Sequence, residues 1–539
     1  MQSMDYQYYD EPDYIDVDDD DAGNGGHAEM ENGFPYGYHN PSRLNPNQED
    51  DDYYQDATVA ERHLTLMERL SDNLENCVQP SLIQVAQYMA PMLILCLVSR
   101  ILKQIYARRR GTVAQSEANC LSVAPLHVIN SVCGIILLYL TLGPRLGIIL
   151  VLNIISYALL QFVRLGNGQR GAIAIAALTI GSQFLYELAI WRQRQDWPQL
   201  RGIQMVANMK VISVAFDLTG SKDEITMPGP LAYLGYILNP ATCLLGPWIR
   251  YAHYVESLVD NKGSHNWLHN LRHMILNVLL CLLTLAISNC LAPTLSDMTG
   301  SSHTLLMYTG ALSVRTSHYF VCFLAQALLA CANQRLEEEP TNSNWWLGHL
   351  VSRPGQIEWP RSLNSLVRSW NIPMHDWLKR YVYRGAMATG SSQHLLVSVF
   401  CTYLISSLLH GMDLRIYLVL LSLAAFGQGE MMLRRHLAQS FDACISANPC
   451  RGSELCRYSR CPAKPKCGPF VNLLIRLANL GFTLLVIYHL AYLGVVLLNE
   501  SLSTDLDEES GSFMWHWSEA GYLSHYLGIG MFVLYLFIS

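Results

Sequence analysis

The chain has 539 residues, of which 51% are hydrophobic and 15% charged, and its mean hydropathy of +0.16 is high for a soluble globular protein. These values exclude a chain made of several soluble domains and favour one large helical membrane domain. The net charge of −8 comes largely from the N-terminal segment, so it says little about partners.

Residues 1–75 form an acidic tail. The tail is rich in Asp, Tyr, Gly and Asn, as in NQEDDDYYQD, and lacks any apolar periodicity, so we predict that it is disordered. Met1–Asp20 has neither the basic start nor the apolar run of a secretory signal peptide, and we expect the first spanning helix to act as the targeting signal. Residues 76–539 are predicted to form a multi-span membrane domain.

Apolar windows of roughly 17 to 25 residues, each long enough to cross the hydrocarbon core, recur along this domain. They predict an all-α polytopic membrane protein with about eleven transmembrane helices, near residues 82–102, 125–142, 146–163, 171–190, 231–249, 271–292, 304–333, 394–411, 413–432, 470–498 and 522–538. The amphipathic run Arg201–Leu218 and the polar run Gln334–Trp377 are expected to form interfacial or re-entrant helices.

Clusters of Lys and Arg predict which loops face the cytosol. One cluster, Arg100–Arg110, follows the first span, a second comprises Lys379, Arg380 and Arg384, and a third occupies the loop after residue 432. On this basis we expect the acidic tail on the luminal side and His410 near the luminal end of its helix.

Five of the fifteen cysteines gather in a basic loop at about residues 441–469. They are Cys444, Cys450, Cys456, Cys461 and Cys467, with five, five, four and five residues between neighbours. This is not the paired CxxC spacing of a zinc site, so we predict no metal ligands and keep a metal site as the less favoured alternative. Disulfides are not expected in a cytosolic loop, and acylation of one or more of these thiols is a hypothesis.

One histidine, His410, lies between two almost wholly apolar runs in YLISSLLHGMDLRIYLVL. Tyr403, Ser406 and Ser407 share a helix face with it, and such a polar stripe should face the bundle interior or a cavity. The histidine is then either a structural hydrogen-bonding residue or a general base, because an imidazole with a pKa of about 6.5 takes up a proton near neutral pH. Upstream, Asn371 lies next to an X-Pro step on backbone expected to be irregular.

An Asn in a loop, followed about forty residues later by a His within an apolar helix, resembles the motif of the membrane-bound O-acyltransferases. Six stretches resemble, in order, the Wnt-modifying branch of that family: RGIQMVANMKVISVAFDL, LGPWI, SHYFVCFL, RSWNIPMHDWL, SSLLHG and YHLAYLG. The resemblance implies the membrane-bound O-acyltransferase fold. It also implies transfer of a palmitoleoyl group from palmitoleoyl-CoA to a serine hydroxyl of a Wnt protein at the endoplasmic reticulum membrane.

Carried over by this resemblance, the motif residues are His410 and Asn371. We expect His410 to be the general base that removes the serine proton and Asn371 to be the polar partner of the developing oxyanion. The predicted substrate-binding residues are Trp370, Ser407, Lys379, Arg380 and Arg384. The three basic residues would meet the phosphates of coenzyme A, with ordinary positive-inside anchors as the alternative.

Other histidines are weaker candidates for the base. His489 lies in an apolar span beside two tyrosines, where a structural hydrogen bond to a neighbouring helix is favoured. His318, His375 and His394 are placed near span ends. GxSxG, GxxxxGK[ST] and HExxH do not occur in the sequence, so a serine hydrolase, a nucleotide-driven pump and a zincin have no motif support.

We expect no cofactor beyond acyl-CoA as co-substrate, a lipid bilayer and Wnt proteins as partners, and no nucleic acid. The alternative functions are a non-catalytic Wnt-binding chaperone and a membrane transporter. No internal repeat supports the transporter.

Overall fold

The computed structural model describes residues 71–111, 123–165, 168–188, 197–219, 225–259, 267–298, 302–334, 336, 350–387, 394–448, 450, 456–464, 467–498 and 514–539. The predicted disordered tail, 1–75, therefore lies outside the described residues except for 71–75, which are helical. Nearly all of the described part belongs to one compact unit that begins at Glu75.

Within the described residues the fold is helical, and β structure is limited to a single isolated bridge between Ala443 and Arg460. The first helices are α3 (Gln79–Gly111), α4 (Ala124–Leu142), α5 (Leu146–Leu165), α6 (Gly168–Tyr186), α7 (Trp197–Asp217), α8 (Pro230–Ile237) and α9 (Tyr251–Val259). They are followed by α10 (Trp267–Ala286), α11 (Ala292–Met298), α12 (His303–Ala332), α13 (Pro354–Glu358), α14 (Leu363–Trp370) and α15 (Ile372–Leu378). The last are α16 (Arg384–Met387), α17 (His394–Leu409), α18 (Leu414–Ser440), α19 (Pro469–Val495), α20 (Trp515–Glu519) and α21 (Leu523–Ile538).

Short segments with other helical geometry join several of these helices. They are the π-helical η1 (Leu74–Val78), η6 (Ile287–Leu291) and η8 (Lys379–Tyr383) and the 3₁₀ turn η3 (Gly143–Arg145). The turn η3 contains Pro144 and separates α4 from α5, which the sequence predicts as two spans.

Six helical stretches among the described residues are long and apolar enough to cross a membrane. They are Ser71–Ala107, Ala124–Phe162, Trp267–Met298, His303–Ala332, Leu414–Ser440 and Pro469–Val495, and the shorter apolar helices are Leu396–Leu409 and Leu523–Ile538. Large apolar side chains on the outer helices are exposed, such as Phe162, Phe470 and Phe537, which fits a lipid-facing surface. Every predicted span overlaps a helix, but 231–249 is helical only as far as Ile237, and the count of eleven is not confirmed.

One predicted span and one predicted alternative are wrong. The span at 231–249 is the eight-residue α8 followed by irregular backbone, because Pro240 and Pro247 interrupt any continuing helix. Most of the polar and apolar residues of the run Arg201–Leu218 are buried in α7, so the interfacial alternative is wrong and the re-entrant alternative stays a prediction. Irregular backbone is tolerated here because protein surrounds it.

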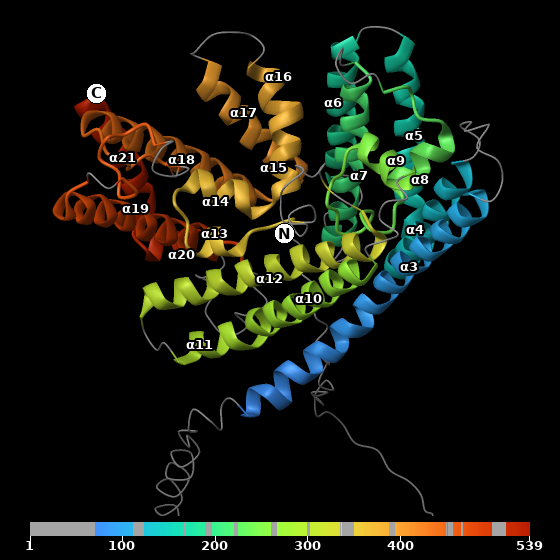
Figure 1. Ribbon diagram of the computed structural model, residues 1–539, viewed down its shortest axis with the longest axis horizontal. Helices are drawn as coiled ribbons and strands as arrows, with labels where there is room; N and C mark the ends of the chain where they lie inside the picture. Colours follow the sequence, from blue (N-terminus) through green and yellow to red (C-terminus); the bar gives the residue numbers. More distant parts are fainter. Residues whose placement is uncertain are drawn as a thin grey trace, which may run out of the picture. The chain divides into compact units, whose positions relative to one another are not determined.

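Helix α12 is the most buried of the candidate spans, and it lies beside α10, α19 and α3 (Figure 1). A second group consists of α6, α7, α15 and α17, whose side chains share one apolar cluster around Trp377 and Leu409. Helices α18 and α21 pack together, with Gly528 of α21 against the ring of Phe426 of α18.

The end of α8 depends on a buried lysine of α7. Lys210 is fully buried, and its ammonium group donates to the carbonyl oxygens of Tyr236 and Ile237, the last two residues of α8, at 3.0 and 3.1 Å. A third donation goes to the hydroxyl of Thr242 at 2.9 Å. The lysine therefore supplies donors to carbonyls at a helix end that water does not reach.

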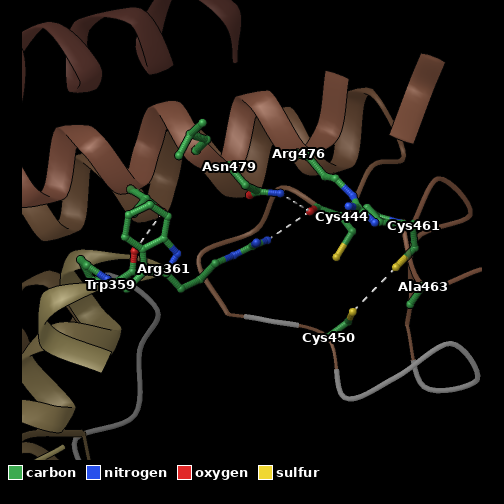
Figure 2. Close-up of a pocket in the computed structure, with 12 residues that line it drawn as sticks. Trp359, Arg361, Cys444, Cys450, Cys461, Ala463, Arg476 and Asn479 are labelled. Carbon is green, nitrogen blue, oxygen red and sulfur yellow. Dashed lines mark hydrogen bonds between the residues drawn. The ribbon is translucent and has the colours of Figure 1, made fainter. Parts of the chain in front are cut away.

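The loop between α18 and α19 folds back on itself (Figure 2). The amide of Cys444 donates to the carbonyl of Arg460 at 2.9 Å, and the sulfur atoms of Cys444, Cys450, Cys456 and Cys461 come within 4.8 Å of one another. Four or five residues separate neighbouring cysteines in the sequence, yet their thiols lie close together in the structure. The sequence spacing therefore does not argue against a metal site.

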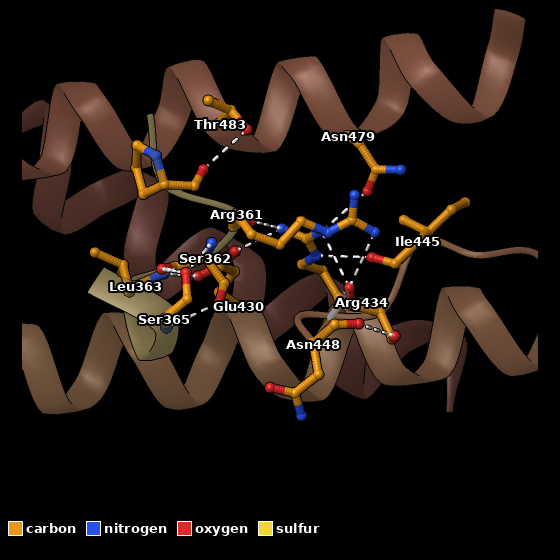
Figure 3. Close-up of polar contacts among 12 residues, drawn as sticks. Arg361, Ser362, Leu363, Ser365, Glu430, Arg434, Ile445, Asn448, Asn479 and Thr483 are labelled. Atoms are coloured by element: carbon orange, nitrogen blue, oxygen red, sulfur yellow. Dashed lines mark hydrogen bonds and ion pairs between the residues drawn. The ribbon is translucent and has the colours of Figure 1, made fainter. Parts of the chain in front are cut away.

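Arg434 of α18 joins four segments at the base of this loop (Figure 3). Its guanidinium donates to the carbonyls of Ile445 at 2.8 Å and Arg361 at 2.7 Å and to the side chain of Asn479 at 3.0 Å. It also pairs with Glu430 at 2.9 Å, whose other carboxylate oxygen accepts from the amide of Leu363. The pair is buried, so its stabilisation depends on every donor having an acceptor.

Replacing Arg434 by Met should lower the free energy of unfolding by about 3 to 5 kcal/mol, because Glu430 and several carbonyls lose their buried partner. Thermal unfolding of the detergent-solubilised protein measures this. Arg435→Met is the matched control, because Arg435 is the exposed neighbour on the same helix. Equal melting temperatures for the two variants would contradict the role given to Arg434.

Candidate active site around His410 and Asn371

His410 is the first residue after α17, in the turn that leads into α18. Its amide donates to the carbonyl of Ser407 at 2.9 Å. Gly411 follows with a φ of +78°, a conformation that side chains disfavour. The next helix begins after Asp413, whose carboxylate caps it by accepting from the amide of Arg415 at 3.1 Å. The turn therefore reverses the chain within a few residues and places His410 outside the regular hydrogen bonding of both α17 and α18.

Residues of α6 and α7 brace this turn from the side. Gln183 donates to the carbonyl of Leu409, the last residue of α17, at 3.2 Å. Glu187 accepts from the amide of Met412 at 3.0 Å and pairs with Arg201 at 3.4 Å. The backbone on both sides of His410 is thus held by side chains from elsewhere in the chain.

A buried amide chain extends this brace along α7. Gln204 donates to Asn208 at 2.8 Å, and Asn208 donates to Gln183 at 2.9 Å. Sequence reasoning missed these residues, although Arg201, Gln204 and Asn208 recur at helical spacing. That periodicity predicts an interfacial or re-entrant helix, and in the structure it marks the face of α7 that turns toward Gln183.

The imidazole of His410 is half-buried and makes no hydrogen bond with another described residue. Two of the four histidines weighed against it, His489 and His318, use one ring nitrogen in the fold. Nδ1 of His489 pairs with the hydroxyl of Ser524 in α21 at 2.5 Å, which confirms the predicted structural bond to a neighbouring helix. His318 lies in the middle of α12, not near its end as predicted, and its Nε2 lies 2.9 Å from the carbonyl oxygen of Trp370. Within the described residues, His410 differs from these two in that neither of its ring nitrogens forms a hydrogen bond, a property shared by the half-buried His375.

Asn371 ends α14 and begins α15. Its backbone is extended, with φ −142° and ψ 94°, and its side-chain oxygen accepts from the amide of Met374 at 3.1 Å. The oxygen of the amide is therefore occupied by the helix cap, and no described residue accepts from its nitrogen. An amide fixed in this way presents N–H groups to whatever lies beside it.

The two motif residues are connected through one apolar cluster. Trp377 of α15 packs with Leu409, the neighbour of His410, and its indole donates to the carbonyl of Met209 at 3.0 Å. Met374, the residue capped by Asn371, packs against the same cluster. Helix α15 thus positions both the Asn371 cap and the end of α17, although the described contacts include none between His410 and Asn371 themselves.

The structure places the remaining predicted residues as follows. The ring of Trp370 stacks on His318 with centroids 4.4 Å apart, and the buried hydroxyl of Ser407 donates to Tyr403 within its own helix at 3.0 Å. Lys379 and Arg384 are exposed and Arg380 is half-buried, all within η8 or at the start of α16. Their role toward coenzyme A stays a prediction.

Residues 136–463 match the membrane-bound O-acyltransferase family, and this segment contains the α6, α7, α15 and α17 elements of the site. The chain belongs to the membrane-bound O-acyltransferase family. A Drosophila melanogaster protein named protein-serine O-palmitoleoyltransferase porcupine is 53% identical over 99% of this chain and 100% of its own length. The Homo sapiens protein of the same name is 30% identical over 86% of this chain and 97% of its own length.

More distant members of the membrane-bound O-acyltransferase family use another class of acceptor by name. Membrane-bound glycerophospholipid O-acyltransferase 2 of Mus musculus is 24% identical over 56% of this chain and 65% of its own length. The similarity of the chain is thus both higher and more complete toward the Drosophila and human relatives named for a protein serine.

Gly411→Ala should lower the acyl-transfer activity by up to about 10²-fold, the cost of a displacement near 1 Å at a reacting group. A Cβ at this position would lie 2.4 Å from a carboxylate oxygen of Glu187 and 2.8 Å from the side chain of Arg201, so the brace has to shift. Gly481→Ala is the control, because its Cβ would meet nothing within 4 Å. Unchanged turnover in the Gly411 variant would show that the turn does not position His410.

Proposed function

We propose that the chain transfers a palmitoleoyl group from palmitoleoyl-CoA to a serine hydroxyl of Wnt proteins at the endoplasmic reticulum membrane. The observation that carries this proposal is the similarity over 99% of the chain to a relative named for that reaction on protein serines. The Wnt acceptor follows from the branch of the family that the sequence motifs resemble. The geometry adds a half-buried imidazole without a described partner and a fixed amide on a neighbouring helix.

His410 acts as the general base in this proposal. It takes the proton of the serine hydroxyl while the serine oxygen bonds to the thioester carbonyl carbon. The carbon–sulfur bond then breaks, and the protonated His410 donates this proton to the departing thiolate of coenzyme A. The products are the serine ester and the free thiol. Proton transfer of this kind contributes typically about 10²- to 10⁴-fold to the rate.

Asn371 acts as a donor to the thioester carbonyl oxygen, which becomes an oxyanion during the attack. Its oxygen already accepts from Met374, so its nitrogen is the atom directed to the substrate. A donor held before the reaction needs no reorganisation as charge develops, which makes such a group effective.

The side of the membrane on which the transfer occurs is also part of the proposal. Cys77, just before α3, forms a disulfide with Cys290 of η6, and disulfides persist in oxidising compartments such as the lumen. The basic run at the other end of α3 favours the cytosol for that end. These two features support a luminal start of α3. The basic groups before α17 and after α18 support the same side for His410, which lies at the opposite ends of those helices.

His410→Ala should reduce transfer of labelled palmitoleoyl from the coenzyme A thioester to a Wnt peptide by about 10²- to 10⁴-fold, with the melting temperature unchanged. His436→Ala is the control, because His436 is a half-buried histidine on α18 whose ring contacts Tyr535.

Asn371→Asp separates the helix-capping role of Asn371 from its role as a hydrogen-bond donor, because aspartate caps a helix as well as asparagine does but cannot donate. Asn371→Asp should keep the melting temperature and lose about 10²- to 10³-fold in transfer rate, whereas Asn371→Ala should also lose about 1 kcal/mol of stability. Near-normal transfer by a folded His410→Ala protein would refute the assignment of the base. Transfer by the wild type to glycerophospholipid, with none to the serine peptide, would refute the acceptor.

A tag placed before Met4 should resist protease in intact microsomes and be digested once detergent opens them, because the tail precedes the luminal start of α3. Cys77→Ser should abolish the difference in mobility between reduced and unreduced protein. Digestion of the tag in sealed vesicles would contradict the proposed orientation.

A further inference from the structure

Four sulfur atoms converge in the loop between α18 and α19, away from the site around His410. They belong to Cys444, Cys450, Cys456 and Cys461, and all lie within 4.8 Å of one another. Three of these side chains are buried and Cys450 is partly buried, so the sulfur cluster is a small core of its own.

The spacing of the sulfur atoms suits a tetrahedral metal ion. Figure 2 shows Cys450 and Cys461 facing each other with their Sγ atoms 3.7 Å apart. A disulfide requires about 2.05 Å. Four sulfurs at 2.3 Å from a zinc ion form a tetrahedron whose edges are about 3.8 Å long. The observed separation therefore matches two ligands of one metal ion and not a covalent pair.

The backbone around the cluster is fixed by hydrogen bonds that do not use the thiols. Residues 443 and 460 are bridged, and the amide of Lys464 donates to the carbonyl of Cys461 at 2.9 Å, which closes a tight turn at that ligand. The carbonyl of Cys444 accepts from Asn479 of α19 and from Arg361, each at 3.1 Å. Such outer contacts orient ligands before the ion binds.

The charges around the cluster complement a thiolate site. Four thiolates and one divalent cation carry a net charge of −2. Lys464 places its ammonium group on the carbonyls of Cys456 and Tyr458 at 3.0 and 2.8 Å, and Arg361 and Arg476 line the adjoining pocket.

We propose that Cys444, Cys450, Cys456 and Cys461 bind one Zn²⁺ in a structural site. Four protein ligands leave no open coordination position, so the ion holds the fold and takes no part in acyl transfer. Cys467 is not a ligand, because it packs on the separate apolar cluster of Ala443, Ile445 and Ile475 against α19. Acylation of the loop is then restricted to Cys467, since the other four thiols bind the metal.

The ion would brace the helix that ends at Asn371. Arg361 contacts Cys444 and precedes α14 by two residues, and Arg368 within α14 donates to Asn448 of the loop at 2.9 Å. The Arg434 pair with Glu430 joins the same loop to the first amide of α14. Loss of the metal should therefore loosen the support of α14.

The test is the zinc content of the full-length protein, purified in detergent with a thiol reductant and without added metal, by mass spectrometry of the element. We expect about one zinc per chain in the wild type and in Cys467→Ser, and background zinc with a lower melting temperature in Cys461→Ser. Zinc at background in a folded wild type would overturn the proposal. Full zinc in a folded Cys461→Ser would do the same.

A second measurement does not depend on the folding of a variant. Wild-type protein produced with Co²⁺ in place of zinc should show the intense visible bands and thiolate charge-transfer absorption of tetrahedral cobalt–sulfur coordination. Peptide mapping of the wild type should recover all four cysteines as thiols. Octahedral cobalt spectra, or a mapped disulfide between Cys450 and Cys461, would overturn the proposal.

Discussion

The constraint behind much of this structure is that a helix end inside an apolar bundle still has unpaired backbone groups, and water cannot pair them. Side chains from neighbouring helices do so instead. Lys210 serves the end of α8, Arg100 of α3 donates to the carbonyls of Ala330 and Cys331 at the end of α12, and Gln183 serves the end of α17. Each such side chain is long, polar and buried, and the bonds of Arg100 and Gln183 join helices that are distant in sequence.

His410 and Asn371 also lie at helix ends, but the imidazole of His410 and the amide nitrogen of Asn371 form no hydrogen bond with a described residue. His410 and Asn371 both lie where one helix stops and another starts, so their side chains can leave the helical surface. The backbone at His410 is satisfied by Gln183 and Glu187, and the oxygen of Asn371 by its own cap. The fold therefore does not require the imidazole or the amide nitrogen as structural bonds, which leaves both for a reacting group.

How much of this was accessible from the sequence depends on the range of the interactions involved. Apolar length identified most of the spans, and an isolated polar residue within an apolar run identified His410. Composition could not separate a lipid-spanning helix from buried irregular backbone at 231–249, because both are apolar and only Pro240 and Pro247 hint at the difference. The polar face of α7 was visible in the sequence, but its partner Gln183 lies on another helix. The convergence of the four cysteines was not visible for a similar reason, because paired CxxC spacings describe local turns, whereas this loop is closed by contacts with Arg460, Asn479 and Arg361.

The disulfide between Cys77 and Cys290 imposes an order on biosynthesis. The two cysteines are 213 residues apart, so at about 5 to 20 residues per second the second one follows the first by roughly 10 to 40 s. On the proposed topology, the first span waits in the membrane during that interval with a reduced thiol at its luminal end. Cys290 lies in η6, before α12 in the chain, so the bond can form once α4 to α10 have been inserted, and its closure links the start of α3 to η6 independently of α12.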